Sequence, residues 1–435
     1  MQRRRVLEAQ PAQALTLAVD TARRLTASAV GSAAEAAQRS DDPRVPSWRP
    51  AGLWGGYAGL AVLAAAMDAV DPESGWDAVG LGHLRCAVRA VEAERAAQAG
   101  LGGLAGLATA ASLLSHDGAR YGTLVTTLEK AIVERVERAS EKVLRSRPHG
   151  VPVSLFDVIT GLTGVGRYLL DRTRSQPCRR ALHKLLRAFV YLSEESADAV
   201  PHWHTSFRHT TENLRSVQPH GNLNLGMAHG LPGPLALLSL STSHGVEVSG
   251  QHDAIVRTAD LLVHAQSGDE WGLGFPATES VRRRREGTSP PARSAWCYGP
   301  PGVARALWLA GAASGRSDYR DLAVAAMTAV FERPIANRRI DSPTLCHGVA
   351  GLLQVTMRFA RDGAGASFST AAHELTGQLL AAHEPESPFG YRDLKPTGLR
   401  IDNPGLLEGA AGVGLVLLGA ASSVEPVWDR VLMLS

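Results

Sequence analysis

The chain alternates between two kinds of helix-length segment, one apolar on nearly all sides and one apolar on a single face. A helix of the first kind must be buried all round, whereas a helix of the second kind covers a core and faces water. The apolar segments are clearest at residues 60–70, 107–114, 234–240, 303–313 and 413–421. The amphipathic segments, with Glu and Lys or Arg on one face, are clearest at 121–146, 179–193, 317–333 and 368–383. We therefore expect an inner and an outer set of helices.

A Gly-x-x-Gly motif precedes or begins each apolar segment. It occurs seven times, at Gly56/Gly59, Gly103/Gly106, Gly161/Gly164, Gly230/Gly233, Gly299/Gly302, Gly348/Gly351 and Gly409/Gly412. The spacing of roughly 47 to 69 residues, with one buried and one half-exposed helix in each unit, indicates a helical repeat architecture. Glycine suits the start of an inner helix because a Cβ would clash where helices converge. In the first two repeats the motif is interpreted as packing and turn chemistry alone.

The last repeat indicates how the array of repeats ends. An open solenoid needs polar terminal repeats, yet residues 409–421 are as apolar as the middle repeats. Closure into a ring removes this need. Signals for β-strands are sparse, and no alternating run is long enough for a sheet domain. The sequence thus predicts an all-α fold, an α/α toroid (barrel) of about seven inner and seven outer helices.

The length of the chain also favours a ring. At 435 residues the chain exceeds the size at which a single core usually divides, and a closed ring of repeats explains how one domain reaches it. Residues 1–50 are expected to form an N-terminal helical lead-in, with an amphipathic helix over about 7–38 ended by the breaker segment 41–50. Residues 51–435 form the toroid, in one domain with the lead-in.

Charge and composition exclude several classes of protein. Lys and Arg number 45 against 42 Asp and Glu, a balance that argues against a nucleic-acid partner. Four cysteines scattered over the chain form no disulfide framework and fit a reducing compartment. Glu8, Gln10 and Gln13 interrupt any apolar signal core, and no apolar run reaches about 18 residues. We expect a cytoplasmic protein without a transmembrane segment.

Two motifs suggest a metal site split along the chain. Cys297 lies in Ser294–Val303, and Cys346 and His347 lie in Thr344–Leu352. Two thiolates and an imidazole are the three protein ligands of an open zinc site, whose fourth position takes water or substrate. A closed structural site would need a further ligand, usually from a short Cys-x-x-Cys pair, which the sequence lacks. The alternative is that both cysteines are small buried hydrophobes.

The repeat register favours the metal site over buried cysteines. Cys297 and Cys346 both lie two positions before the first glycine of their motifs, and His229, Tyr298, His347 and Glu408 lie one position before. In a ring, equal offsets place side chains at the same end of the barrel. Core cysteines have no reason to keep this register. We therefore expect Cys297, Cys346, His347 and His229 to share one end.

A second group of histidines competes as a metal site. It comprises His202, His204, His209 and His220. His-x-His spacing can bind a metal, but no thiolate or carboxylate keeps register with this stretch. We interpret it as a polar loop.

Four of these motifs together resemble the lanthionine synthetase C-like family, the stand-alone lantibiotic cyclases of the nisin cyclase type. They are Trp296–Gly299, Cys346–Gly348, Ala228–Gly230 and Phe156–Asp157, each in its Gly-x-x-Gly setting. The resemblance extends from about residue 52 to 418. It implies an α/α toroid with Zn²⁺ held by Cys297, Cys346 and His347. It further implies active-site roles for Asp157, His229, Arg293 and Tyr298, although Arg293 lies in a loop-like Pro-Pro-Ala-Arg context.

The family resemblance implies a carbon–sulfur bond-forming enzyme. A Cys thiolate of a dehydrated precursor peptide, consisting of leader and core, adds to dehydroalanine or dehydrobutyrine and closes a (methyl)lanthionine ring. We expect His229 to protonate the enolate at Cα, and Arg293 and Tyr298 to stabilise its oxygen. Asp157 would hold the tautomer of His229 or, alternatively, cap the helix that begins near Gly161. The family is also compatible with a complex of dehydratase, cyclase and exporter.

Other functions remain open at this point. The basic run Arg282–Arg285 would attract an acidic part of a leader peptide or would simply be a solvated loop. The same fold and zinc would also suit addition of glutathione or another small thiol to dehydroamino acids. Another alternative is a non-catalytic scaffold of a peptide-modifying complex, although a scaffold has no need of an open metal site. A toroid glycosidase needs paired carboxylates, and only Asp157 and Glu408 lie near the register, at different offsets.

Overall fold

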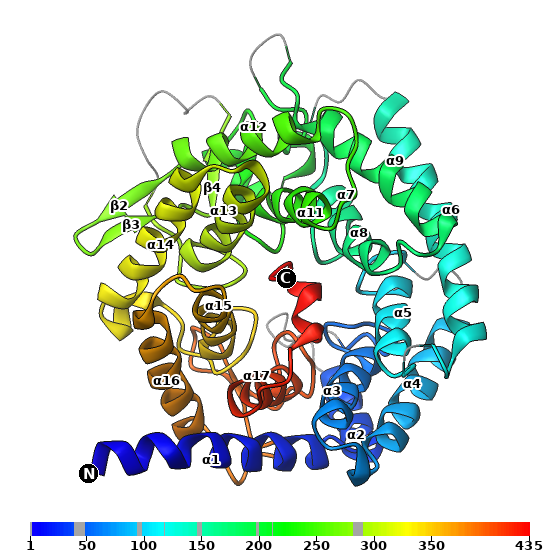
Figure 1. Cartoon of the computed structure of the whole chain (residues 1–435), viewed down its shortest axis with the longest axis vertical. Helices are drawn as coiled ribbons and strands as arrows, with labels where there is room; N and C mark the ends of the chain where they lie inside the picture. The colour runs from blue at the N-terminus through cyan, green and yellow to red at the C-terminus, as the bar shows by residue number, and fades with distance from the viewer. Residues whose placement is uncertain are drawn as a thin grey trace. The chain divides into compact units, whose positions relative to one another are not determined.

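The computed structural model describes residues 2–38, 48–93, 98–116, 118–145, 150–196, 200–210, 212–281 and 290–435. The helices form two compact units (Figure 1). The first unit comprises Met1–Leu128 and Arg339–Trp428, and the second comprises Glu129–Arg338 and Asp429–Ser435. Helix α6 (Gly122–Arg145) and the 3₁₀-helix η5 (Val427–Leu432) cross from one unit into the other.

The first unit has an inner row of helices that begin at the Gly-x-x-Gly motifs. In spatial order they are α15 (Val349–Arg361), α17 (Ala410–Ala421), α3 (Tyr57–Val70) and α5 (Leu104–Leu113). Nearly every residue in the first three turns of α3 and α17 is buried, as expected for helices apolar on all sides. Outer helices α4 (Trp76–Ala93), α16 (Ala366–Ala381) and α1 (Gln2–Arg24) pack on α3, α15 and α17 respectively (Figure 1). Short elements are α2 (Ala27–Gln38) and η1 (Pro72–Ser74).

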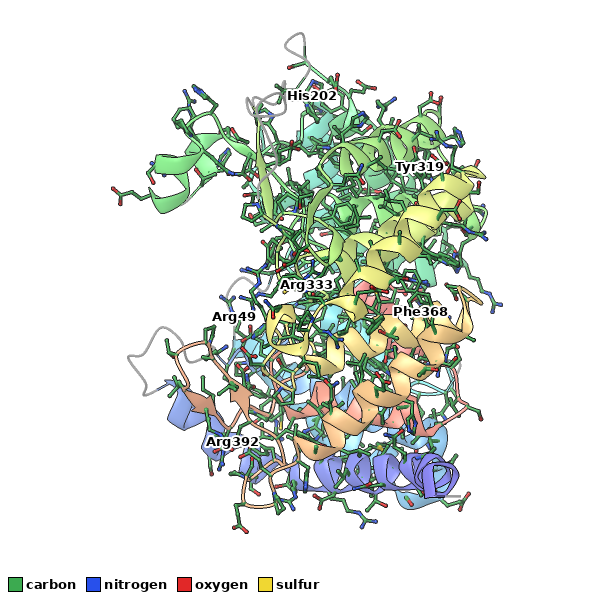
Figure 2. The ribbon with its side chains drawn as sticks, turned by 90° about the vertical axis from the view of Figure 1, so that its left-hand side faces the viewer. Arg49, His202, Tyr319, Arg333, Phe368 and Arg392 are labelled. Atoms are coloured by element: carbon green, nitrogen blue, oxygen red, sulfur yellow. The ribbon has the colours of Figure 1, made fainter. Side chains whose placement is uncertain are left out.

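The second unit repeats this plan. Its inner helices are α8 (Leu162–Asp171), α11 (Pro232–Ser243) and α13 (Pro300–Ser314), and its outer helices are α9 (Gln176–Ser193), α12 (Gln251–His264) and α14 (Ser317–Glu332). Short helices are α7 (Val153–Phe156), η2 (Phe207–His209), α10 (Glu212–Val217) and η4 (Ile335–Arg338). Outer helices of both units insert an aromatic ring into the core, Tyr319 of α14 and Phe368 of α16, each 1% exposed (Figure 2). All seven predicted inner helices are thus present.

The N-terminal segment differs from the single helix expected over 7–38. The structure has two helices, because α1 ends at Arg24 and α2 starts at Ala27. Thr26 lies at the break, and its Oγ1 accepts a hydrogen bond from the amide of Ala29 at 3.3 Å. Threonine at such a position satisfies a free amide of the next helix and favours a new start. Because α1 packs against α17 and α16, it is the outer helix of the last repeat.

Strands are few among the described residues, as predicted. Three short antiparallel pairs occur: β1 (Asn222–Asn224) with β4 (Thr278–Ser280), β2 (Ser267–Asp269) with β3 (Gly272–Gly274), and β5 (Asp393–Leu394) with β6 (Arg400–Ile401). All of them lie in loops between helices. Beside β5, Arg392 pairs with Glu384 and Asp402 and ties this loop to the end of α16 (Figure 2). None of the described helices has the length and apolar character needed to cross a membrane.

The C-terminal segment of the second unit supports the loop that carries Cys297. Trp296 is fully buried, and its Nε1 donates to the carbonyl of Leu432 at 3.0 Å. The buried guanidinium of Arg305, on α13, donates from Nε to the carbonyl of Leu434 at 2.7 Å. The Trp296 bond thus anchors the residue next to Cys297 to the C-terminal segment, and the Arg305 bond anchors α13 to the same segment.

His83 makes the stability of the first unit sensitive to acid. It lies on α4 with 4% of its surface exposed, and burial lowers its pKa to about 4, against an opposing hydrogen bond with the backbone of Leu25. Below pH 6.5 the unfolded chain binds a proton that the folded chain binds only near pH 4. The free energy of unfolding is therefore at its full value above pH 6.5 and falls as the pH drops toward 4.

We expect wild type to lose about 2 kcal/mol of unfolding free energy between pH 7.5 and pH 5 through His83. Urea unfolding of wild type and His83→Gln at both pH values measures this loss. The variant should lack this part of the pH dependence, and His252→Gln, which changes an exposed histidine, should retain it. Equal pH dependence in wild type and His83→Gln contradicts the prediction.

Candidate active site

Backbone hydrogen bonds join the segments that precede neighbouring inner helices. In the first unit, the amide of Cys346 donates to the carbonyl of Leu407 at 2.8 Å, and the amide of Leu407 donates to Trp54 at 2.9 Å. In the second unit, the amide of Ala228 donates to the carbonyl of Cys297 at 3.3 Å. All five residues lie two positions before a repeat glycine. Equal offsets therefore do lie side by side within each unit, at the N-terminal ends of the inner helices.

The first unit brings Cys346, His347 and Glu408 together. One ligand atom from each lies within 4.8 Å of the others, and His347 Nδ1 is 3.8 Å from Glu408 Oε1. Donor atoms around a tetrahedral zinc lie roughly 3.3 to 3.8 Å apart, given metal–ligand distances of about 2.0 to 2.3 Å. Thiolate, imidazole and carboxylate are all zinc ligands. The group therefore has the donor types and nearly the spacing that a zinc ion needs. The repeat register places Glu408 at the offset of His347, but the sequence did not mark it as a ligand.

A buried carboxylate faces the other nitrogen of His347. Asp393, fully buried at the start of β5, places Oδ1 3.9 Å from His347 Nε2 and accepts a hydrogen bond from Ser342 Oγ at 2.9 Å. Lys395 Nζ lies 2.7 Å from Asp393 Oδ2 and 3.3 Å from Glu408 Oε2. Burial works against the charge of Lys395, but the Asp393 hydrogen bond and both carboxylates outweigh it and raise its pKa. The lysine thus bridges the two carboxylates that flank His347.

We expect Asp393→Asn to weaken metal binding by about 10- to 100-fold, because a carboxylate behind a ligating histidine fixes its tautomer and ring orientation. Competition with a chromophoric chelator measures the zinc affinity. Asp402→Asn, in the same loop but paired with Arg392, is the matched control and should bind zinc like wild type. An unchanged zinc affinity in Asp393→Asn would remove this residue from the metal centre.

The second unit holds a histidine–aspartate pair. His229 Nδ1 lies 2.6 Å from Asp157 Oδ2, with the histidine side chain 40% exposed and the aspartate 2% exposed. The other oxygen of Asp157 accepts hydrogen bonds from the amides of Gly161 at 2.7 Å and Thr160 at 2.8 Å. Asp157 therefore serves both alternatives drawn from the sequence, since one oxygen holds His229 and the other holds the start of α8. Its ionised form obliges Nδ1 of His229 to carry the proton, which leaves Nε2 for chemistry.

Tyr298 is held by a residue that sequence reasoning missed. Asn224 Nδ2 donates to the Tyr298 hydroxyl at 3.1 Å, and Asn224 Oδ1 accepts from the amide of Gly226 at 3.0 Å. A Cβ on Gly226 would lie 2.5 Å from the Tyr298 ring and 2.5 Å from the Cys297 carbonyl, so glycine is required there. Asn224 belongs to β1, outside the repeat offsets, and no register marks it.

The remaining predicted residues are Cys297, Arg293 and the basic run Arg282–Arg285. Cys297 is 7% exposed in the second unit, and its joining Cys346 and His347 in one metal site stays a prediction. Arg293 is half-buried, and its carbonyl approaches Gly299, whose φ of +99° requires glycine. The catalytic role of the Arg293 side chain also stays a prediction. Arg282–Arg285 lies outside the described residues.

Two of the four competing histidines contact the backbone through their rings. His202 Nδ1 contacts the carbonyl of Tyr191 at 3.0 Å, and His204 Nδ1 contacts that of Pro201 at 2.8 Å. These contacts favour the structural interpretation of this loop, and in the described part of the chain its histidines do not gather with other metal ligands.

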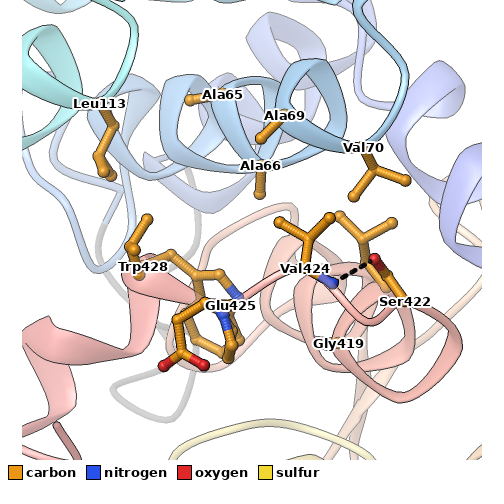
Figure 3. Close-up of a pocket in the computed structure, with 13 residues that line it drawn as sticks. Ala65, Ala66, Ala69, Val70, Leu113, Gly419, Ser422, Val424, Glu425 and Trp428 are labelled. Atoms are coloured by element: carbon orange, nitrogen blue, oxygen red, sulfur yellow. Dashed lines mark hydrogen bonds between the residues drawn. The ribbon is translucent and has the colours of Figure 1, made fainter. Parts of the chain in front are cut away.

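A separate apolar cavity of about 80 Å³ lies in the first unit (Figure 3). Its walls come from the C-terminal halves of α3 and α17, from Leu113 at the end of α5 and from the segment through Trp428. Cys346, His347 and Glu408 precede the N-termini of inner helices, at the opposite end of this unit. The cavity is therefore distinct from the candidate metal centre.

Comparison with known proteins identifies the family. The profile of the lanthionine synthetase C-like protein family matches residues 47–433. The chain belongs to this family. The nisin biosynthesis protein NisC of Lactococcus lactis subsp. lactis is 26% identical over 330 residues, which cover 74% of this chain and 73% of NisC. This result confirms the resemblance drawn from the four motifs.

A solved structure confirms the fold. Nisin cyclase matches 93% of this chain and 95% of its own chain with a TM-score of 0.77 at 21% identity. The lanthionine synthetase C-like chain thus has the fold of nisin cyclase, and the predicted all-α, α/α toroid class is correct.

Proposed function

We propose that this chain is a zinc-dependent lanthipeptide cyclase that forms (methyl)lanthionine rings. Membership of the lanthionine synthetase C-like family makes it a cyclase-type enzyme. The observation that carries the zinc proposal is the convergence of Cys346, His347 and Glu408 within 4.8 Å. Cys297, at the equivalent offset of another repeat, would supply the second thiolate. The substrate would be a dehydrated precursor peptide.

The reaction forms one carbon–sulfur bond and moves one proton. When bound, zinc would lower the pKa of the substrate thiol and so provide a thiolate nucleophile at neutral pH. In free cysteine this pKa is about 8.5. The sulfur electron pair attacks the β-carbon of dehydroalanine or dehydrobutyrine, and the double-bond electrons pass to the carbonyl as an enolate. Protonation at Cα then gives the thioether, with no net change in the atoms of the peptide.

His229 is the proton donor in this scheme. The carboxylate of Asp157 fixes the proton on Nδ1 and stabilises the imidazolium, so that Nε2 carries the proton that moves to Cα. The 40% exposure of His229 leaves its ring accessible to a peptide. Tyr298, oriented by Asn224, and Arg293 would stabilise the enolate oxygen.

The chemistry also bears on partners and location. Free thiols at all four cysteines suit a reducing compartment, and we place the enzyme in the cytoplasm. A dehydratase must act before it, because the acceptor carbons are dehydroamino acids, and an exporter would take the product. The basic run Arg282–Arg285 would bind the leader peptide.

The test is ring formation in a dehydrated peptide incubated with the zinc-loaded protein. Cyclisation leaves the mass unchanged but removes free thiols, so products should resist alkylation by N-ethylmaleimide. Elemental analysis should give one zinc per chain. Glutathione in excess should not replace the peptide thiol. Formation of glutathione adducts in place of rings would support small-thiol addition, and a folded chain that takes up no zinc would leave only a scaffold role.

A further inference from the structure

Asn224 holds both ends of the turn that carries His229. Its Oδ1 accepts a hydrogen bond from the amide of Gly226 at 3.0 Å, where the turn begins. Its carbonyl accepts one from the amide of Leu231 at 2.9 Å, where the turn ends. A Cβ on Gly230 would lie 2.6 Å from Asn224 Oδ1, so the turn closes tightly over this side chain. The backbone of His229 is therefore tied to Asn224 from both sides.

The same side chain reaches Tyr298 of the next repeat. Asn224 Nδ2 donates to the Tyr298 hydroxyl at 3.1 Å. The two backbones are also joined, because the amide of Ala228 donates to the carbonyl of Cys297 at 3.3 Å, and the residues that follow this pair are His229 and Tyr298. Asn224, His229 and Tyr298 are each half-buried. All three side chains are therefore partly accessible.

Closure of the turn does not account for the bond to Tyr298. In the first unit, Asn403 Oδ1 accepts from the amide of Gly405 at 2.8 Å, and its carbonyl accepts from the amide of Ala410 at 2.9 Å. These are the two bonds that Asn224 makes within its own turn. Both use oxygen atoms of asparagine and leave the NH₂ group out. The bond from Nδ2 to Tyr298 is thus an additional contact of Asn224.

The direction of this bond orients the Tyr298 hydroxyl. An amide NH₂ group can only donate, so the Tyr298 oxygen is the acceptor. The hydroxyl proton is then directed away from Asn224, toward a different acceptor. In the proposed reaction that acceptor is the enolate oxygen.

We propose that Asn224 is a positioning residue that determines the configuration of the new Cα centre, an inference that rests on the proposed function. An enolate is planar, and its configuration after protonation depends on which face receives the proton. The proton leaves His229 Nε2, the enolate electron pair forms the carbon–hydrogen bond, and the carbonyl is restored. Tyr298 holds the plane at its oxygen, and His229 delivers the proton to one face. The side chain that holds both residues therefore selects the face.

Addition to dehydroalanine tests the proposal, because it creates a stereocentre at Cα alone. Each zinc-loaded, full-length protein is incubated with a synthetic peptide that contains one cysteine and one dehydroalanine. Chiral gas chromatography of the hydrolysed product separates the lanthionine diastereomers, and a reaction without enzyme gives the uncatalysed background. Asn224→Asp keeps an acceptor for the amide of Gly226 but offers Tyr298 no donor. Asn224→Ser also keeps an acceptor, but its side chain is too short to reach Tyr298.

The matched control is Asn337→Asp, which makes the same chemical change at an exposed asparagine of η4. We expect wild type and this control to give one diastereomer. Both Asn224 variants should give a mixture of the two, at a rate lower by about tenfold or more. General damage to the fold would lower the rate without raising the second diastereomer above the background. The diastereomer ratio therefore distinguishes a positioning role from a structural one.

Tyr298→Phe leaves the turn of Asn224 in place and should give the same mixture. Adding Asn224→Ser to it should cause no further change, because both substitutions remove one contact. A single diastereomer from the Asn224 variants or from Tyr298→Phe would overturn the inference and leave the proposed cyclase standing. Wild type that forms no ring would instead remove the proposed function and this inference with it.

Discussion

Cys346→Ala should purify without zinc and should form rings at least about 100-fold more slowly than wild type. Cys346 supplies the thiolate of the only donor group that gathers among the described residues, and its amide bond to Leu407 fixes its position beside Glu408. Without it, the first unit offers zinc only the neutral imidazole of His347 and the carboxylate of Glu408, a weak pair. Zinc content by elemental analysis and the rate of thiol loss from a dehydrated peptide measure the two effects.

The matched control is Cys178→Ala, which removes a fully buried cysteine of α9. Burial raises the pKa of the Cys178 thiol, as expected for an inert core residue. This variant should keep one zinc per chain and the wild-type rate, with only a loss of stability. If both cysteine variants behave alike, thiol loss acts through folding, and Cys346 is no ligand.

Cys297→Ala tests, in the same assay, whether the second unit contributes a zinc ligand. We expect it to retain weak zinc binding, because Cys346, His347 and Glu408 gather within the first unit without it. Full zinc affinity in Cys297→Ala would mean that the second thiolate does not come from this residue.

The repeat explains why much of the site could be predicted from sequence. Gly-x-x-Gly fixes where each inner helix begins, and the bonds from Cys346 to Leu407 and from Ala228 to Cys297 show that equal offsets become neighbours. A feature that depends on offset, such as the proximity of His347 to Glu408, can therefore be predicted from the spacing of the motifs. Residue chemistry then suffices to propose the metal ligands and the proton donor.

Features outside the repeat had no such signal. Asp393 and Lys395 lie on and beside a two-residue strand in a loop, and only the fold brings them to His347. Asn224 reaches Tyr298 from β1 in the same way. Helix α1 was expected as a lead-in, yet its partner α17 lies almost the whole chain away. Long-range packing of irregular segments decides these contacts, and local pattern does not encode it.

Asp157→Asn should lower the rate of ring formation by about 10²- to 10⁴-fold while leaving zinc content and folding nearly unchanged. Asparagine keeps a carbonyl oxygen for the amides of Gly161 and Thr160, so the start of α8 survives. Toward His229, however, it presents an NH₂ group in place of a carboxylate. The imidazole must then accept at Nδ1, and no negative charge remains to stabilise its protonated form.

Asp157→Ala separates the two duties of this side chain. It should lose the same factor in rate, because the charge beside His229 is gone in both variants. It should also lose about 1 to 3 kcal/mol of unfolding free energy, because the buried amides of Gly161 and Thr160 lose their acceptor. Single-turnover rates of thiol loss and urea unfolding midpoints give both quantities. A rate within threefold of wild type in Asp157→Asn, together with a stability loss in Asp157→Ala, would reduce Asp157 to a helix cap. His229 would then lack its orienting partner, and the proton donor would have to be sought elsewhere in the second unit.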